Sequence, residues 1–145
     1  MKTLKLIIDE NTLVEYEKYY FALHPRARNR PIAQPYHESI NEWFIMRRAQ
    51  MNALKQKWKD FIVWFVKSKG LSDKRIEKCK MKFVSYFPTN IRHDCDNYVP
   101  KFILDGLVEG GLVVDDDCKH IQSLTLEGDT DKSRPRTEIT IYIYE

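Results

Sequence analysis

The sequence lacks the features that mark several large protein classes. No run of apolar residues is long enough to cross a bilayer, and the first six residues show neither a long apolar core nor a small-residue cleavage site. Three cysteines, Cys79, Cys95 and Cys118, are an odd number, which favours reduced thiols over a disulfide framework. We therefore expect a cytoplasmic protein that is not embedded in a membrane.

The usual catalytic signatures are also missing. There is no Gly-rich phosphate loop, no nucleophile elbow and no His-Glu zinc helix, and the four scattered histidines form no evident triad. Repeats, low-complexity tracts and linkers are absent as well. With 145 residues, of which 43% are hydrophobic, the chain suits one domain spanning residues 1–145 around a real core.

Charge is distributed unevenly along the chain. Residues 18–69 carry eleven Lys or Arg against three Asp or Glu, whereas residues 94–131 carry two Lys against ten acids. A basic surface beside an acidic pocket is typical of a nuclease, in which cations hold the phosphate backbone and carboxylates hold a metal. Mutual neutralisation of the two regions across one domain is an equally good interpretation of the counts alone.

The hydrophobic pattern predicts an α+β fold, with a mixed β-sheet packed by one long and one shorter α-helix. Alternating apolar residues predict four strands, at residues 2–8, 75–87, 120–126 and 136–144. An apolar stripe with only Arg47 interrupting it predicts the long helix, at 38–69, and Pro100 is tolerable in the first turn of the second helix, at 97–109. Residues 11–35, broken by three prolines, are interpreted as an irregular connection, and 127–133 as a polar turn.

Several basic residues are candidates for binding DNA phosphates. They lie in the proline-bounded loop, on the long helix, and on the polar face of the second strand: Arg26, Arg28, Arg30, Arg47, Arg48, Lys78, Lys80 and Lys82. A solvated loop and a charged sheet face or protected edge are the alternatives.

Acidic residues gather at two places, the Asp94-Cys95-Asp96-Asn97 element and the Asp115-Asp116-Asp117 triplet. Carboxylates repel one another, so such clusters favour a compensating cation, and hard oxygen ligands suit Mg²⁺. If the helix between them returns the chain to the same sheet edge, Asp94, Asp96 and Asp116 could surround one ion. Each cluster alone is also common in turns and caps.

Lys101 lies one turn into the helix between the two acidic clusters. It could neutralise charge on a phosphoryl transition state. The simpler alternative is a surface ion pair with Asp105 at i,i+4.

A zinc site is a competing interpretation of the same region. His93, Cys95, Cys118 and His120 form two mirror-image pairs of zinc-type ligands, although their one-residue spacing is atypical. Buried, inert thiols would be the simpler explanation for Cys95 and Cys118.

The run His93-Asp94-Cys95-Asp96-Asn97, Lys101, Asp105-Gly106-Leu107, Gly110-Gly111 and Val114-Asp115-Asp116 resembles the RusA family of Holliday junction resolvases. The order and spacing match over roughly residues 80–120, with one extra residue between Asn97 and Lys101. The resemblance implies a homodimeric, Mg²⁺-dependent endonuclease that cuts four-way DNA junctions by symmetric nicks. It also implies that Asp94, Asp96, Asp116 and Lys101 are catalytic, with Asp115 in support.

We therefore expect a crossover junction endodeoxyribonuclease, with Mn²⁺ as a possible substitute for Mg²⁺ and branched DNA and a second copy of the chain as partners. A non-catalytic protein that binds branched or single-stranded DNA is one alternative, and a zinc-stabilised interaction module is another.

Overall fold

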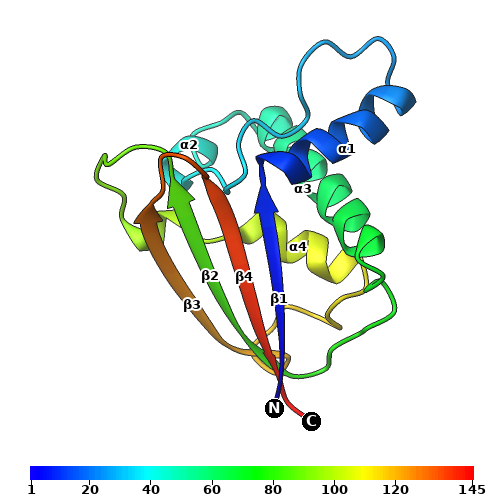
Figure 1. Cartoon of the computed structure of the whole chain (residues 1–145), viewed down its shortest axis with the longest axis vertical. Helices are drawn as coiled ribbons and strands as arrows, with labels where there is room; N and C mark the ends of the chain where they lie inside the picture. The colour runs from blue at the N-terminus through cyan, green and yellow to red at the C-terminus, as the bar shows by residue number, and fades with distance from the viewer.

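In the computed structural model, which describes residues 1–145, four strands form one mixed sheet (Figure 1). The order across the sheet is β1-β4-β2-β3, and β4 runs antiparallel to both of its neighbours, whereas β2 and β3 are parallel. The strands are β1 (Lys2–Asp9), β2 (Cys79–Phe87), β3 (Ile121–Thr130) and β4 (Arg136–Ile143). The predicted α+β class with a mixed sheet is confirmed.

Strand β2 shows how the sheet divides polar from apolar residues. Cys79, Met81 and Phe83 are buried on one face, while Lys80 lies exposed on the other, because successive side chains point to opposite faces. The helices cover the apolar face, and the buried residues of β2 and β4 join Trp58, Phe61 and Phe65 in one core cluster (Figure 1).

The helical layer contains four α-helices and one 3₁₀ helix. These elements are α1 (Glu10–Leu23), α2 (Ile40–Trp43), α3 (Arg48–Ser68), η1 (Cys95–Tyr98) and α4 (Lys101–Glu109). Helices α3 and α4 pack closely at Gly106, where an added Cβ would lie 2.5 Å from Cβ of Ile62. None of the helices is long and apolar enough to span a bilayer.

The predicted irregular connection over residues 11–35 is wrong for its first half, which is helix α1. Asp9 caps this helix, because its side chain accepts a hydrogen bond from Thr12 N while the Thr12 hydroxyl accepts one from Asp9 N. Leu13 and Tyr16 face the core three residues apart. The prolines begin at Pro25, beyond the helix end, so they do not oppose it.

The predicted helix over residues 38–69 is two helices. Arg47 has an extended backbone (ψ 148°) and precedes α3 as its N-terminal cap residue, so the chain turns between α2 and α3. Phe44, an apolar residue of the stripe that predicted one buried helix face over residues 38–69, is instead 73% exposed. Arg47, the one polar residue that interrupts the apolar stripe, therefore lies where the chain leaves the helical conformation between α2 and α3.

The structure also differs from the predicted helix over residues 97–109 and from the predicted polar turn over residues 127–133. Residues 97–109 are not continuous, because η1 ends at Tyr98 and Pro100 becomes the cap residue of α4 rather than part of its first turn. Strand β3 continues to Thr130, through most of the expected polar turn, because it pairs with β2 up to Phe87.

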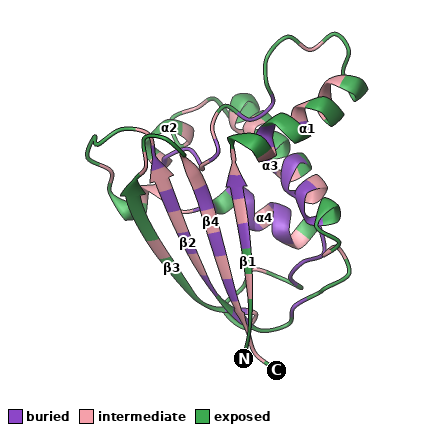
Figure 2. Cartoon of the chain, viewed as in Figure 1, coloured by how far each residue is buried: buried purple, intermediate pink, exposed green.

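Strand β3 differs from the rest of the sheet in its exposure. It forms one edge of the sheet, and only Ile121 is buried while Leu126 is partly buried (Figure 2). Leu124 and Leu126 pair with Met81 and Phe83 on the helix-covered face, yet Leu124 remains 37% exposed because the helices do not cover this edge. The edge therefore offers unpaired backbone groups and uncovered apolar side chains.

Candidate active site

The first acidic segment follows the end of β2 and is held there by stacked rings. His93 lies parallel to Phe87, with ring centroids 3.8 Å apart, and Tyr98 packs on Phe87 at 4.7 Å. These contacts fix η1 beside the end of the strand. Asp94 and Asp96 are left exposed to solvent.

The carboxylates of this segment have few local partners. Asp94 Oδ1 lies 3.3 Å from Nε of the exposed Arg92, while its backbone oxygen accepts a hydrogen bond from Asn97 N. An exposed ion pair of this kind is weak, so it leaves the oxygens of Asp94 available. Such free carboxylate oxygens are the ligands that Mg²⁺ prefers.

Lys101 begins α4, directly after the η1 segment. Its Nζ lies 3.4 Å from Oδ1 of Asp105, one turn along the helix. The surface pair considered from the sequence is therefore present. Lys101 is exposed, and a pair of this type costs little to break.

His37, which the sequence did not single out, holds the start of α4. Its Nε2 accepts a hydrogen bond from Phe102 N at 3.0 Å, so Nδ1 carries the proton and donates to Glu38 O at 2.7 Å. Burial disfavours the charged ring and lowers the pKa of His37 to about 4. The contact spans 65 residues, which no local pattern reveals.

The second acidic segment precedes β3 and uses its oxygens differently. Asp115 Oδ1 accepts a hydrogen bond from Asp116 N, and Asp117 Oδ1 accepts from the backbone of Lys119 and His120 and from the His120 ring. The bond from the His120 ring holds the pKa of Asp117 below its ordinary value. Ligand atoms of Asp115, Asp117 and His120 lie within 4.8 Å of one another.

Within one chain, the two acidic segments lie at opposite ends of the sheet. Asp94 and Asp96 follow the last residue of β2, whereas Asp116 precedes the first residue of β3, and the two strands are parallel. A nine-residue strand spans roughly 25 Å. The hypothesis that the chain returns along α4 and gathers these three carboxylates around one ion is not met within a single copy.

The same separation corrects the zinc interpretation. His93 and Cys95 lie beyond the end of β2, whereas Cys118 and His120 lie before the start of β3, so the four residues cannot share an ion within a single copy of the chain. His93 is instead engaged with Phe87 and His120 with Asp117. The expectation that Cys95 and Cys118 are buried is also wrong, since both are exposed.

Most of the predicted DNA-binding cations lie on the surface, and some already have partners. Arg26, Arg28, Arg47 and Arg48 are exposed. Arg30 bonds to Glu10 and Glu17, both at 2.6 Å. Lys82 pairs with Glu127 on the polar face of the sheet, where the Nζ atoms of Lys78 and Lys80 lie over the ring of Tyr144.

The loop after α1 and the α2–α3 turn lie at the end of the sheet where β1 and β2 end (Figure 1). The arginines of these segments therefore share this end with Asp94 and Asp96. The chain thus combines exposed cations and free carboxylates at one end.

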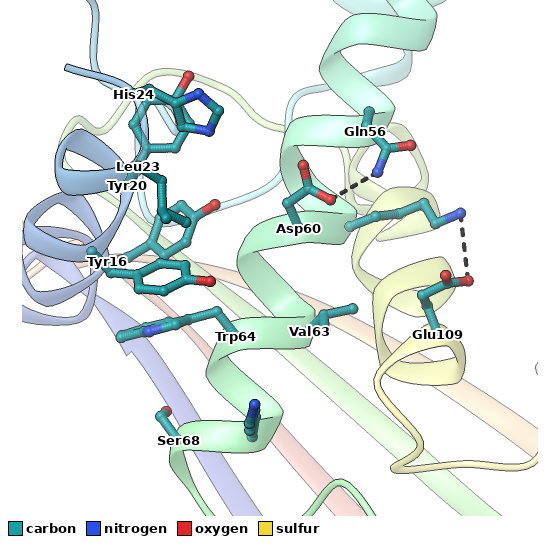
Figure 3. Close-up of a pocket in the computed structure, with 13 residues that line it drawn as sticks. Tyr16, Tyr20, Leu23, His24, Gln56, Asp60, Val63, Trp64, Ser68 and Glu109 are labelled. Atoms are coloured by element: carbon teal, nitrogen blue, oxygen red, sulfur yellow. Dashed lines mark hydrogen bonds and ion pairs between the residues drawn. The ribbon is translucent and has the colours of Figure 1, made fainter. Parts of the chain in front are cut away.

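A separate cavity lies between α1, α3 and the end of α4. It measures about 610 Å³, and Tyr16, Tyr20 and Trp64 form an aromatic wall (Figure 3). Of its charged residues, Lys59 forms an ion pair with Glu109, and Asp60 accepts a hydrogen bond from the amide of Gln56. Burial raises the pKa of Tyr16, which packs on Trp64 at 5.2 Å. None of the predicted site residues lines this cavity.

The sequence was compared with models of known protein families and with curated proteins. A family model described as Endodeoxyribonuclease RusA matches residues 3–142. The matched range includes all four strands almost completely, both acidic segments and the helix between them. No curated protein matches the chain.

Proposed function

Because this chain belongs to the RusA family of endodeoxyribonucleases, we propose that it is a Mg²⁺-dependent nuclease that resolves four-way DNA junctions by paired, symmetric cuts. The family match over residues 3–142 carries this proposal. The exposed carboxylates and the exposed arginines at one end of the molecule support it, because a junction nuclease must hold both a divalent ion and a polyanion.

The donor set fits a hard divalent cation. Asp94, Asp96 and Asp116 would hold Mg²⁺, with Asp115 in support, and all four offer carboxylate oxygens of the kind that Mg²⁺ or Mn²⁺ takes. When bound, the ion would polarise a phosphoryl oxygen and lower the pKa of an attacking water. Asp116 makes no side-chain hydrogen bond to its own turn, in contrast to Asp115 and Asp117.

The cations of this chain would position the DNA and offset charge at the cut. Lys101 can leave Asp105 and turn its ammonium group toward a phosphate, where it would stabilise developing negative charge. Arg26, Arg28, Arg47 and Arg48 would hold backbone phosphates, which orients the substrate without reading sequence.

A homodimer would bring the two acidic segments together. If β3 pairs antiparallel with β3 of a second copy, the end of one strand lies beside the start of the other. The Asp94–Asp96 segment of one subunit then meets the Asp115–Asp117 segment of its partner. Two composite centres result, related by a two-fold axis, as the symmetry of a crossover requires.

The exposed edge of β3 suits this pairing. With Thr125 on the two-fold axis, Leu124 of each subunit would lie directly opposite Leu126 of the partner subunit, on the helix side of the sheet but at the edge that the helices do not reach. An edge strand of ten residues with uncovered leucines is otherwise an aggregation hazard. The register therefore covers the apolar surface and completes both centres.

Mixing two inactive variants tests this arrangement. We expect Asp94→Asn and Asp116→Asn each to bind a synthetic four-way junction without cutting it. After subunit exchange, a composite site predicts heterodimers with one intact centre. The mixture should then nick one strand at about a quarter of the wild-type rate per protein.

A mixture of Asp94→Asn with Asp96→Asn is the matched control, because both changes fall in the same segment and leave no intact centre. Nicking by neither mixture, with an active wild type, would place each centre within one subunit. An inactive wild type in Mg²⁺ and Mn²⁺ would instead favour the alternative, a non-catalytic protein that binds branched or single-stranded DNA. The separation of the acidic segments within one chain is the observation that keeps this alternative open.

A further inference from the structure

The turn between α2 and α3 exposes large apolar side chains beside basic ones. Phe44 is 73% exposed and Ile45 is 83% exposed, and Met46 follows them; these three residues are called the apolar turn below. Ile45 is the most exposed large hydrophobic residue of the chain. Burying such side chains is favourable, so a surface that presents two of them in succession is suited to a partner.

The apolar turn is held by hydrogen bonds at both ends. Phe44 N donates to Ile40 O and Met46 N donates to Trp43 O, and Met51 N donates to Arg47 O at the start of α3. Trp43 is anchored inward against Phe102 of α4, with ring centroids 5.2 Å apart. Phe44 and Ile45 are therefore presented outward from a fixed base.

Positive charge dominates on the C-terminal side of the apolar turn, whereas Glu42 lies two residues before it. Arg47 and Arg48 follow it directly, and residues 43–59 contain five Lys or Arg and no Asp or Glu. Helix α2 packs beside η1, the element that carries Asp96. The apolar turn thus lies at the same end of the molecule as the first acidic segment, next to cations that suit phosphates.

We propose that the apolar turn is a wedge that enters the branch point of the DNA and separates a base step, while Arg47 and Arg48 hold the flanking phosphates. Apolar side chains placed between base steps unstack and kink DNA, and the cost is lowest where stacking is already interrupted, as at a crossover. The wedge would therefore favour branched over continuous duplex DNA. This inference rests on the proposed junction nuclease, because it assigns the source of its selectivity.

Fluorescence of 2-aminopurine at the crossover measures the wedge without requiring cleavage. With Ca²⁺ in place of Mg²⁺, the wild type should raise the fluorescence of a labelled four-way junction. The double variant Phe44→Ser, Ile45→Ser should lose most of this rise and lower the preference for junction over duplex by about tenfold, in line with the loss of buried apolar side chains. Its affinity for plain duplex should stay unchanged.

Leu23→Ser is the matched control, because Leu23 is 59% exposed but lies on α1 beside the aromatic cavity. It should keep the wild-type fluorescence rise. An undiminished rise in the double variant would overturn the wedge. So would conversion of the double variant to a monomer in sedimentation, which would assign the apolar turn to a subunit contact. If the wild type does not cut the junction, the proposed nuclease function is wrong. The fluorescence measurement still tests the wedge in that case, because it does not require cleavage.

Discussion

Two short acidic segments flank α4, and they use their carboxylates in opposite ways. In the first, Asp94 has only an exposed arginine as a side-chain partner, and stacked rings rather than carboxylates fix the backbone. In the second, Asp115 and Asp117 hold the turn together by accepting hydrogen bonds from backbone N–H groups. A cluster of acids in a sequence can therefore be a metal site, a turn, or both.

Within the second acidic segment, Asp116 differs from its neighbours Asp115 and Asp117 in its hydrogen bonds. Asp116 lies between two aspartates whose Oδ1 atoms accept hydrogen bonds within the turn, whereas its own carboxylate makes no such bond. If Asp116 is the metal ligand proposed above, the turn would orient it in the way that supporting groups orient a ligand. His120 contributes to the same turn by bonding to Asp117.

The largest expected effect contrasts two neighbours in the second segment. Asp116→Asn should lower junction cleavage by about 10²-fold or more, because it removes a proposed ligand, while Asp117→Asn should lower it by at most about tenfold, because it only loosens the turn. Single-turnover rates in Mg²⁺ measure both. Equal losses in the two variants would erase the distinction between ligand and support.

A pH titration tests how the start of α4 is held by His37. The pKa of buried His37 is about 4 against an ordinary value of 6.5, so the unfolded chain binds the extra proton first. Its contribution is fully present above pH 6.5 and is lost as pH falls toward 4, by up to about 3 kcal/mol.

The comparison variant is His37→Gln, whose side-chain amide oxygen can still accept the hydrogen bond from Phe102 N but does not titrate. Glu38, whose pKa burial raises, opposes this trend in both proteins, so the difference between them isolates His37. We expect urea unfolding free energies of wild type and variant to converge between pH 6.5 and 4. A constant difference would show that His37 does not titrate on unfolding.

A smaller effect is expected from the packing that separates the two segments. Gly106→Ala places a methyl group 2.5 Å from Cβ of Ile62 and should push α4 away from α3, lowering the free energy of unfolding by about 1–3 kcal/mol. Gly128→Ala, on exposed β3 with its nearest contact at 3.3 Å to the ring of Phe87, is the comparison and should cost less. Thermal unfolding of the two variants gives the ranking.

The parts of the fold and the site that could be predicted from the sequence are those that depend on short-range residue patterns. The alternation in β2 and the terminal strand and the order of acids around Lys101 are properties of short segments, and they predicted the α+β sheet and the family resemblance. Helix α1 has local signals too, namely its capping box and the three-residue spacing of Leu13 and Tyr16, but the prolines that follow it favoured an irregular connection over the whole of residues 11–35.

The order of residues sets the chemistry available to this protein, since the kinds of ligand, the cations and the family motif depend only on which residues occur and in what order. The positions of these groups relative to one another follow from the folded chain. The parallel direction of β2 and β3 sends the two acidic segments to opposite ends, and His37 reaches α4 across 65 residues. Strand direction and long-range contacts come from how the whole apolar surface is buried, and no single segment encodes that.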